Sequence, residues 1–264
     1  MEEATGWQPL AALLAAAERA VAFTGAGIST ESGIPDFRSP GGVWTRYDPR
    51  DFTFAKYVAS ADVRARAWRM RREFWAADPQ PNAAHRALAA LEAAGRLQGV
   101  VTQNIDGLHQ AAGSRTVVEL HGTSREVMCI GHAPRVGTPD GCGFRSGYRW
   151  AFDRIDRGET DPRCPQCGGI VKSATVSFGQ NLFPGVLDVA AALVEQADLV
   201  LAVGSSLQVY PAAGLPAAAA TAGTPLVIVN DETTPLDSLA TLVVRGRAGE
   251  VLAPAVAAAC QTVP

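Results

Sequence analysis

Polar and titratable side chains follow two apolar runs of this chain, at points where the strands of a sheet would end. Gln103-Asn104-Ile105-Asp106 follows the run 99–102, and His121 follows the run 117–120. Ligands of open parallel sheets bind at the carboxyl ends of the strands, where such side chains converge. A histidine titrates near neutral pH and can act as a general base. We therefore expect Asn104, Asp106 and His121 to share one site, with His109 as the second choice of histidine.

A turn of small residues near the N-terminus indicates a dinucleotide site. Gly25-Ala26-Gly27 follows the apolar run 21–24, and amides exposed at such a strand end attract a pyrophosphate. Thr30 stands where the dehydrogenase fingerprint has its third glycine, and Gly33 and Pro35 break any helix soon afterwards. The following residues to Arg38 are therefore expected to loop back over the ligand.

Two later strands end in comparable polar turns. Gly204-Ser205-Ser206 follows the run 199–203, and Asn230-Asp231-Glu232 follows the run 225–229. The first turn suits a pyrophosphate or ribose, and the second could take the hydroxyl groups of the adenosine ribose.

Four of the five cysteines lie between residues 129 and 167. Cys164 and Cys167 form a CxxC knuckle whose spacing lets both thiolates face one tetrahedral ion. The upstream half is irregular, because Cys129 could be joined by either His132 or Cys142. We favour four cysteine ligands, because Cys142-Gly143 resembles the Cys-Gly that commonly closes such knuckles. The zinc ion would be structural, since no general base or open coordination position accompanies the motif. A disulfide and a site that has lost its zinc are the alternatives.

The elements that would position these residues follow an α/β rhythm. Strands are predicted at 21–24, 99–102, 117–120, 199–203, 225–229 and 242–244, and helices at 8–18, 62–77, 82–94, 186–196, 211–222 and from 249. We predict an α/β fold: a Rossmann-like parallel sheet with helices on both faces, plus a small zinc-binding domain. The predicted domains are 1–122 with 176–264 for dinucleotide binding and 123–175 for zinc, with a helical and loop module at 41–80.

Several long motifs of the chain resemble those of the sirtuins, the NAD-dependent protein lysine deacylases. The motifs are GAGISTESGIPDFR from Gly25, TQNIDGLHQAAG from Thr102, ELHG from Glu119, the cysteine-bearing insert, and GSSLQVYPAAGLP from Gly204. The resemblance covers nearly the whole chain. It implies that the acyl oxygen of an acyl-lysine attacks the ribose carbon as nicotinamide leaves, and that a ribose hydroxyl then attacks the intermediate.

The resemblance also implies roles for individual residues. His121 would be the general base on the ribose hydroxyl, with Asn104 and Asp106 positioning the ribose and a water. The cofactor-binding set would be Gly25, Ala26, Gly27, Thr30, Asp36, Phe37, Arg38, Trp44, Gln103, Asn104, Ile105, Asp106, Gly204, Ser205, Ser206, Asn230, Asp231, Glu232 and Ala248. The zinc ligands would be Cys129, Cys142, Cys164 and Cys167.

On the substrate side, the segment 172–180 would pair with a peptide by backbone hydrogen bonds. Val176, Phe178 and Gly179 would line the acyl-lysine tunnel. Desuccinylating relatives carry Tyr and Arg three residues apart in the pocket helix, and Trp68 and Arg71 hold those places here. Only half of that pattern is present, so we expect acetyl or other neutral acyl groups.

Composition limits the other function classes. The net charge is −3 and there is no long basic run, which gives no electrostatic case for nucleic-acid binding. The acidic N-terminus and the lack of a long apolar stretch predict a cytoplasmic protein without a membrane span. We also expect a monomer, and the resemblance implies acylated-lysine proteins as substrates. The alternatives are another deacylase such as a desuccinylase, a mono-ADP-ribosyltransferase, a dehydrogenase, and an NAD-binding sensor without turnover.

Overall fold

The larger sheet of the protein is entirely parallel. The computed structural model describes residues 2–4, 6–36, 42, 45, 48, 50, 53–132, 134 and 141–261. Its first sheet has seven strands in the order β1-β10-β9-β8-β2-β3-β4, and every neighbouring pair is parallel. The strands are β1 (Glu2–Ala4), β2 (Ala20–Thr24), β3 (Leu97–Thr102), β4 (Val117–Glu119), β8 (Leu199–Val203), β9 (Leu226–Val229) and β10 (Leu242–Val244).

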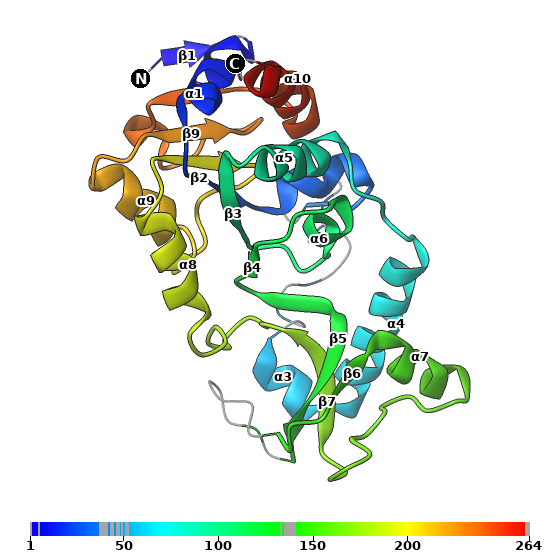
Figure 1. The fold of residues 1–264 in the computed structure, drawn as a ribbon. Coiled ribbons are helices and arrows are strands. Elements are labelled where there is room, and N and C mark those ends of the chain that lie inside the picture. Colours follow the sequence, from blue (N-terminus) through cyan, green and yellow to red (C-terminus); the bar gives the residue numbers. More distant parts are fainter. Residues whose placement is uncertain are drawn as a thin grey trace.

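Helices cover both faces of this sheet, as the sequence predicts (Figure 1). Alternate residues of the central strand β2 pack on opposite faces. Ala20 and Ala22 belong to the core with α1 (Gln8–Ala16), α5 (Ala83–Ala93) and α10 (Ala248–Gln261), whereas Val21 and Phe23 belong to the core with α8 (Val186–Glu195) and α9 (Gly214–Thr221). Five consecutive buried residues explain why β2 reads as an apolar run.

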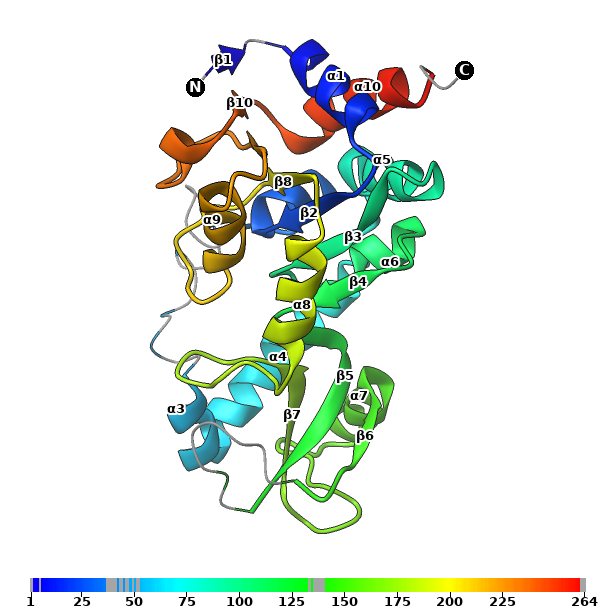
Figure 2. The same ribbon diagram turned by 60° about the vertical axis from the view of Figure 1, so that its left-hand side comes forward.

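A smaller lobe is built on an antiparallel sheet of three strands, in the order β6-β5-β7. It comprises β5 (Gly122–Gly131), β6 (Arg145–Gly147), β7 (Ile170–Thr175), α3 (Phe54–Ala59), α4 (Ala61–Ala76) and α7 (Tyr148–Asp156). Figure 2 shows this lobe below the larger one, with β5 and β7 leading away from the larger lobe. We propose that the zinc insert spans residues 123–175, as the sequence predicts, because β5 begins at Gly122 and β7 ends at Thr175.

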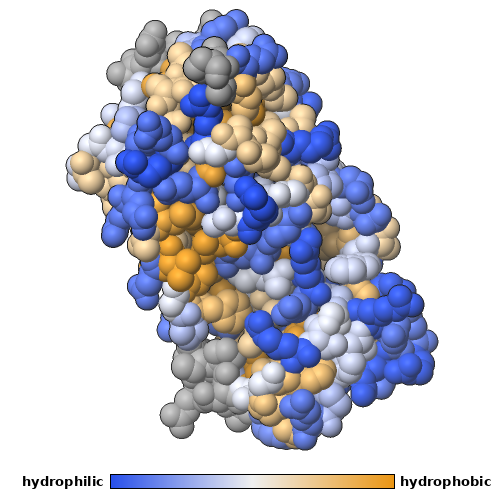
Figure 3. All heavy atoms as spheres, in the orientation of Figure 1, coloured by the Kyte–Doolittle hydropathy of each residue, from blue (hydrophilic) through white to orange (hydrophobic). Residues whose placement is uncertain are grey.

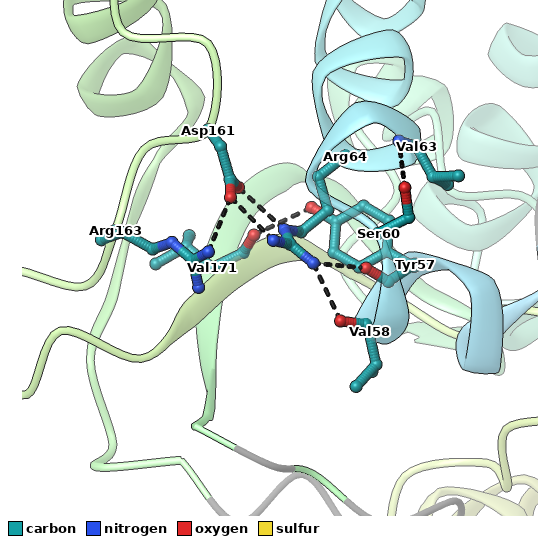
Figure 4. A network of polar contacts seen from close by, with 8 residues as sticks. All are labelled: Tyr57, Val58, Ser60, Val63, Arg64, Asp161, Arg163 and Val171. Atoms are coloured by element: carbon teal, nitrogen blue, oxygen red, sulfur yellow. Dashed lines mark hydrogen bonds and ion pairs between the residues drawn. The ribbon is translucent and has the colours of Figure 1, made fainter.

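A buried ion pair joins the helices of the small lobe to the loop that precedes the second cysteine pair (Figure 4). Arg64 on α4 donates to both carboxylate oxygens of Asp161, from Nε at 2.9 Å and from Nη2 at 2.8 Å. Its Nη1 donates to the backbone oxygens of Tyr57 and Val58, both at 2.9 Å. These bonds satisfy a guanidinium that is only 4% exposed.

Short elements connect the rest of the chain. They are the 3₁₀ helix η1 (Ala26–Ser32), α6 (Leu108–Ala112) and η3 (Asp237–Leu239). None of the helices in the described part of the chain combines the length and the hydropathy that a membrane crossing requires. Figure 3 shows a mostly hydrophilic face with one apolar patch in the region of α8, where Val189 is exposed.

Candidate functional site

One cavity, of about 1300 Å³, collects the predicted residues of both lobes. The large lobe contributes the turns after β2, β3, β8 and β9, which all lie at the carboxyl ends of parallel strands. The small lobe contributes Arg71 and Tyr148, and the segment 175–183 forms another part of the wall. The cavity therefore lies where the larger sheet meets the smaller lobe.

The two glycine-bearing turns touch each other. Gly25 N donates to Val203 O at 3.1 Å, and Gly27 N donates to Gly204 O at 2.8 Å. A Cβ on Gly27 would lie 2.8 Å from Gly204 O and 2.9 Å from Gly204 Cα, so that no side chain fits between the turns. Gly204 has a φ of +56°, which is the left-handed region that glycine adopts without strain. The glycines thus allow the close contact of two turns as well as the approach of a ligand.

A short network of hydrogen bonds fixes the polar residues after β3. Ser29 Oγ donates to Asp106 Oδ2 at 2.8 Å, and Leu108 N donates to the other oxygen at 2.9 Å. Asn104 Nδ2 donates to Gly25 O at 3.0 Å and to Ser29 Oγ at 3.1 Å. The side chains of Asn104 and Asp106 are therefore held in one orientation at the cavity wall, through a serine that the sequence did not single out.

His121 lines the same cavity, and its backbone contact defines its tautomer. Its Nδ1 lies 2.8 Å from Gln103 O. Since a carbonyl oxygen can only accept, Nδ1 carries the proton and Nε2 keeps its lone pair. Burial lowers the pKa of His121 below its ordinary value, while the hydrogen bond to Gln103 acts in the opposite direction. The imidazole is therefore neutral at pH 7 and basic at Nε2.

The other two histidines of the large lobe lie beneath the site. His85 accepts from Asn82 N at the start of α5, so its ring caps this helix. His109, the second choice of histidine, is 1% exposed, with Nε2 2.9 Å from Thr24 Oγ1. The helix α6 that carries it packs against α5, so a histidine between two glycines faces the core.

On the small-lobe side, Arg71 Nε donates to the hydroxyl of Tyr148 at 3.0 Å. Both residues line the cavity. Trp68, predicted to line the acyl pocket, is instead 1% exposed and packs in the core of the small lobe. Its ring meets that of Tyr148 edge-on, with a centroid separation of 6.1 Å. Tyr148 was missed because it lies on α7, a helix that the sequence analysis did not predict.

The four cysteines of the insert come together at the end of the small sheet. Their sulfur atoms all lie within 4.8 Å of one another, with Cys129 Sγ 3.6 Å from Cys167 Sγ and Cys142 Sγ 3.4 Å from Cys164 Sγ. Thiolates at about 2.3 Å from a tetrahedral zinc would be about 3.8 Å apart, so the set fits this ion. His132, the alternative ligand, does not belong to this group.

Most of the predicted cofactor set lines the cavity. The residues concerned are Gly25, Ala26, Gly27, Thr30, Asp36, Gln103, Asn104, Ile105, Asp106, Gly204, Ser205, Ser206, Asn230, Asp231, Glu232 and Ala248. Val176, Phe178 and Gly179 of the predicted substrate set also line it. Phe37, Arg38 and Trp44 lie outside the described residues.

Comparisons with known proteins agree on one family. Residues 25–211 match the Sir2 family. The chain is 48% identical over 235 residues to NAD-dependent protein deacetylase 2 of Streptomyces coelicolor, covering 87% of this chain and 93% of that protein.

Solved structures extend the likeness to the fold. A crystal structure of a Sir2 homologue with NAD is 35% identical with a TM-score of 0.83, covering 99% of this chain and 97% of that one. A Sir2 variant with a deacetylated p53 peptide and 3′-O-acetyl-ADP-ribose is 36% identical with a TM-score of 0.82, covering 92% and 94% of the two chains. The chain therefore belongs to the Sir2 family.

Proposed function

We propose that this protein is an NAD-dependent protein lysine deacetylase that transfers the acetyl group of acetyl-lysine to ADP-ribose and releases nicotinamide. The observation that carries the proposal is His121, whose Nδ1 is held by Gln103 O inside a cavity bounded by two glycine-bearing turns. NAD is the co-substrate, as in the relatives whose names state it. Related proteins hold peptides in this fold, which supports acylated proteins as the second substrate.

The geometry supports distinct tasks for the polar residues. His121 Nε2 accepts a proton from a ribose hydroxyl, because the other ring nitrogen is already occupied. Asn104 turns its amide nitrogen to the protein, which leaves its carbonyl oxygen for the ribose or a water. Asp106, whose oxygens already accept from Ser29 and Leu108, orients the same group.

The remaining residues bind without taking part in proton transfer. The turns at 25–27 and 204–206 offer backbone amides to the pyrophosphate, and the turn at 230–232 offers polar groups to the adenosine ribose. Holding both reactants in near-attack geometry lowers the barrier without a covalent bond to the protein. Zinc on the four cysteines would cross-link the small lobe, since all four ligand positions are filled by sulfur.

Nicotinamide release tests the proposal. Purified protein with NAD and an acetyl-lysine peptide should release nicotinamide and deacetylated peptide in equal amounts. His121→Ala should keep NAD binding and lose about 10²–10⁴-fold in deacetylation, because the general base is gone. Undiminished turnover in that variant would refute the role of His121. NADH absorbance in place of nicotinamide would indicate a dehydrogenase, and NAD binding without either product a sensor.

Acidic acyl groups are a second candidate substrate class, on account of Arg71. In the part of the chain that the structure describes, Arg71 has no carboxylate partner, and its Nε bond to Tyr148 places a phenol hydroxyl beside the cation. We keep neutral acyl groups as the first choice, because Trp68 does not reach the cavity. The rates on matched acetyl and succinyl peptides decide which class of acyl group is preferred. Arg71→Met should reduce kcat/KM on the succinyl peptide by about tenfold or more and leave that on the acetyl peptide near the wild-type value.

A further inference from the structure

Lys172 is a buried cation that the roles above leave unused. It lies in β7 with 1% of its surface exposed, opposite Met128 of β5 in the antiparallel register. Among the described residues no carboxylate forms an ion pair with it, and its contacts are neutral oxygen atoms. Burial first, and then the charge of Arg71, lowers the pKa of Lys172 to about 7.

Lysine is an unusual choice in this chain, which has 21 arginines and only two lysines, Lys56 and Lys172. A guanidinium stays charged inside a protein, whereas an amine can release its proton when it is desolvated. A buried lysine therefore offers hydrogen-bond donors at a site where no counter-ion is at hand. This is a physical reason for an amine at this position.

The donors of Lys172 are used within the segment that follows β7. Its Nζ donates to Thr175 O and, at 3.3 Å, to Gln180 Oε1. The same Gln180 oxygen accepts from Ser177 N at 3.1 Å, and Gln180 N donates to Ser177 O at 2.9 Å. The amine thus links the beginning of the turn 175–180 to its end.

The outer sides of this turn are fixed by both lobes. Val176 N donates to His121 O at 2.8 Å, and Phe178 O accepts from Phe54 N at 2.9 Å. The turn therefore lies between the proposed general base and the start of α3, with Lys172 beneath it. A shift of Thr175 O would move Val176 and, through its amide, the backbone of His121.

We infer that Lys172 is a positioning residue whose amine, together with Gln180, holds the 175–180 turn in the shape that receives the acyl-lysine peptide. The inference rests on the proposed function, because it assigns the peptide to this turn. The NAD side of the cavity, formed by the turns at 25–27 and 204–206, does not contact the amine in the described structure. Loss of the amine should consequently affect the peptide and leave NAD binding unchanged.

Steady-state kinetics test this separation. Lys172→Met keeps an unbranched side chain, one atom shorter, and removes its donors. It should raise the peptide KM about tenfold, with the NAD affinity within about twofold of wild type. Gln180→Ala, which leaves β7 intact, should raise the peptide KM in the same direction by a smaller factor. Lys56→Arg, at an exposed position on α3, is the matched control and should behave as wild type.

Lysine NMR gives a second readout that does not need turnover. Protein labelled isotopically at lysine has two side-chain signals, and Lys56→Arg leaves only that of Lys172. This signal should move when an acetyl-lysine peptide is added and stay in place when NAD alone is added. A titration should show its midpoint near pH 7, well below the ordinary range of a lysine amine.

The outcomes separate the two proposals. Wild-type protein that releases no nicotinamide refutes the deacetylase, while the Lys172 signal still reports whether the peptide reaches the turn. A folded Lys172→Met variant with the peptide KM of wild type overturns the positioning role, as does an equal loss of NAD and peptide affinity. If Lys172→Met does not fold, either of two other results overturns the positioning role. One is an unchanged peptide KM in Gln180→Ala, and the other is a Lys172 signal that does not move when the peptide is added.

Discussion

At the scale of single residues, environment separates side chains of the same type. His121 faces the cavity, with one nitrogen bound to a backbone oxygen. His85 and His109 are fully buried, with their rings 4.9 Å apart, and burial lowers their pKa values to about 4 and about 3. Of these three histidines, only His121 combines access to a ligand with a free basic nitrogen.

These pKa shifts predict the acidic limb of the pH dependence of kcat/KM. The base must be neutral to accept a proton, and burial places the pKa of His121 below 6.5. We therefore expect the acidic limb of kcat/KM to have its midpoint below 6.5, the ordinary pKa of histidine, with the slope of one proton. The limb cannot come from His85 or His109, because their pKa values lie lower.

The pH dependence of kcat/KM for the acetyl-lysine peptide measures this acidic limb, and the affinity for NAD over the same pH range is the control. A midpoint above pH 6.5 would contradict the assignment, since it would require an imidazole whose charged form is stabilised. His121→Ala should remove the limb together with the activity.

At the scale of elements, the sequence predicts well those strands that are apolar runs bounded by polar or turn residues. Strands β8 and β10 have the predicted bounds, because each is a short apolar run between polar residues or glycine. The antiparallel sheet of the small lobe was not predicted. β5 begins at Gly122, directly after the catalytic candidate His121, and no run of turn residues precedes it to mark its start. Tyr148 was missed as a site residue for the same reason, and Lys172 was predicted only as part of the segment 172–180, because the neighbours of both come from this sheet and from α7.

The candidate site was predictable where it depends on strand ends, and unpredictable where it depends on contacts between distant segments. The turns at 25–27, 103–106 and 204–206 follow from the pattern of a parallel sheet. The bond from Ser29 to Asp106 joins residues 77 positions apart, and no local pattern encodes it. Trp68 was misplaced because spacing along a helix does not say which of its faces packs into the core of the small lobe.

The contact between the two glycine-bearing turns predicts a cost for a single methyl group. In Gly27→Ala, the new Cβ would lie within 3.0 Å of three backbone atoms of Gly204. The turns must separate, which we expect to lower the free energy of unfolding by about 1–3 kcal/mol and to weaken NAD binding. Gly147→Ala is the control, because a Cβ there meets no atom within 4 Å. Urea denaturation and NAD titration of both variants measure the difference, and equal behaviour would contradict the packing argument.

At the scale of the whole molecule, the cavity depends on how the small lobe holds its helices. α4 carries Arg71 into the cavity wall and, two turns earlier, carries Arg64 to the zinc-bearing loop. Asp161 stands only three residues before Cys164 in that loop. The ion pair in Figure 4 therefore fixes the helix that carries Arg71 into the cavity wall to the loop that bears the second cysteine pair.

Removing the carboxylate should destabilise the protein more than removing its exposed partner. Asp161→Ala leaves the buried guanidinium of Arg64 with only two backbone oxygens, and an unpaired buried charge costs about 3–5 kcal/mol. Arg163, whose side chain is 46% exposed, also pairs with Asp161 at 2.8 Å. Arg163→Ala should therefore cost less than about 1 kcal/mol.

Urea denaturation of the zinc-loaded variants tests this difference, with the peptide KM as a second measurement. Because α4 would lose its fixed position, Asp161→Ala should also raise the peptide KM, whereas NAD affinity should change little. The double variant Arg64→Met/Asp161→Leu removes both charges and should recover part of the stability that Asp161→Ala loses. Equal losses in Asp161→Ala and Arg163→Ala would mean that the buried pair does not hold the helix to the zinc loop.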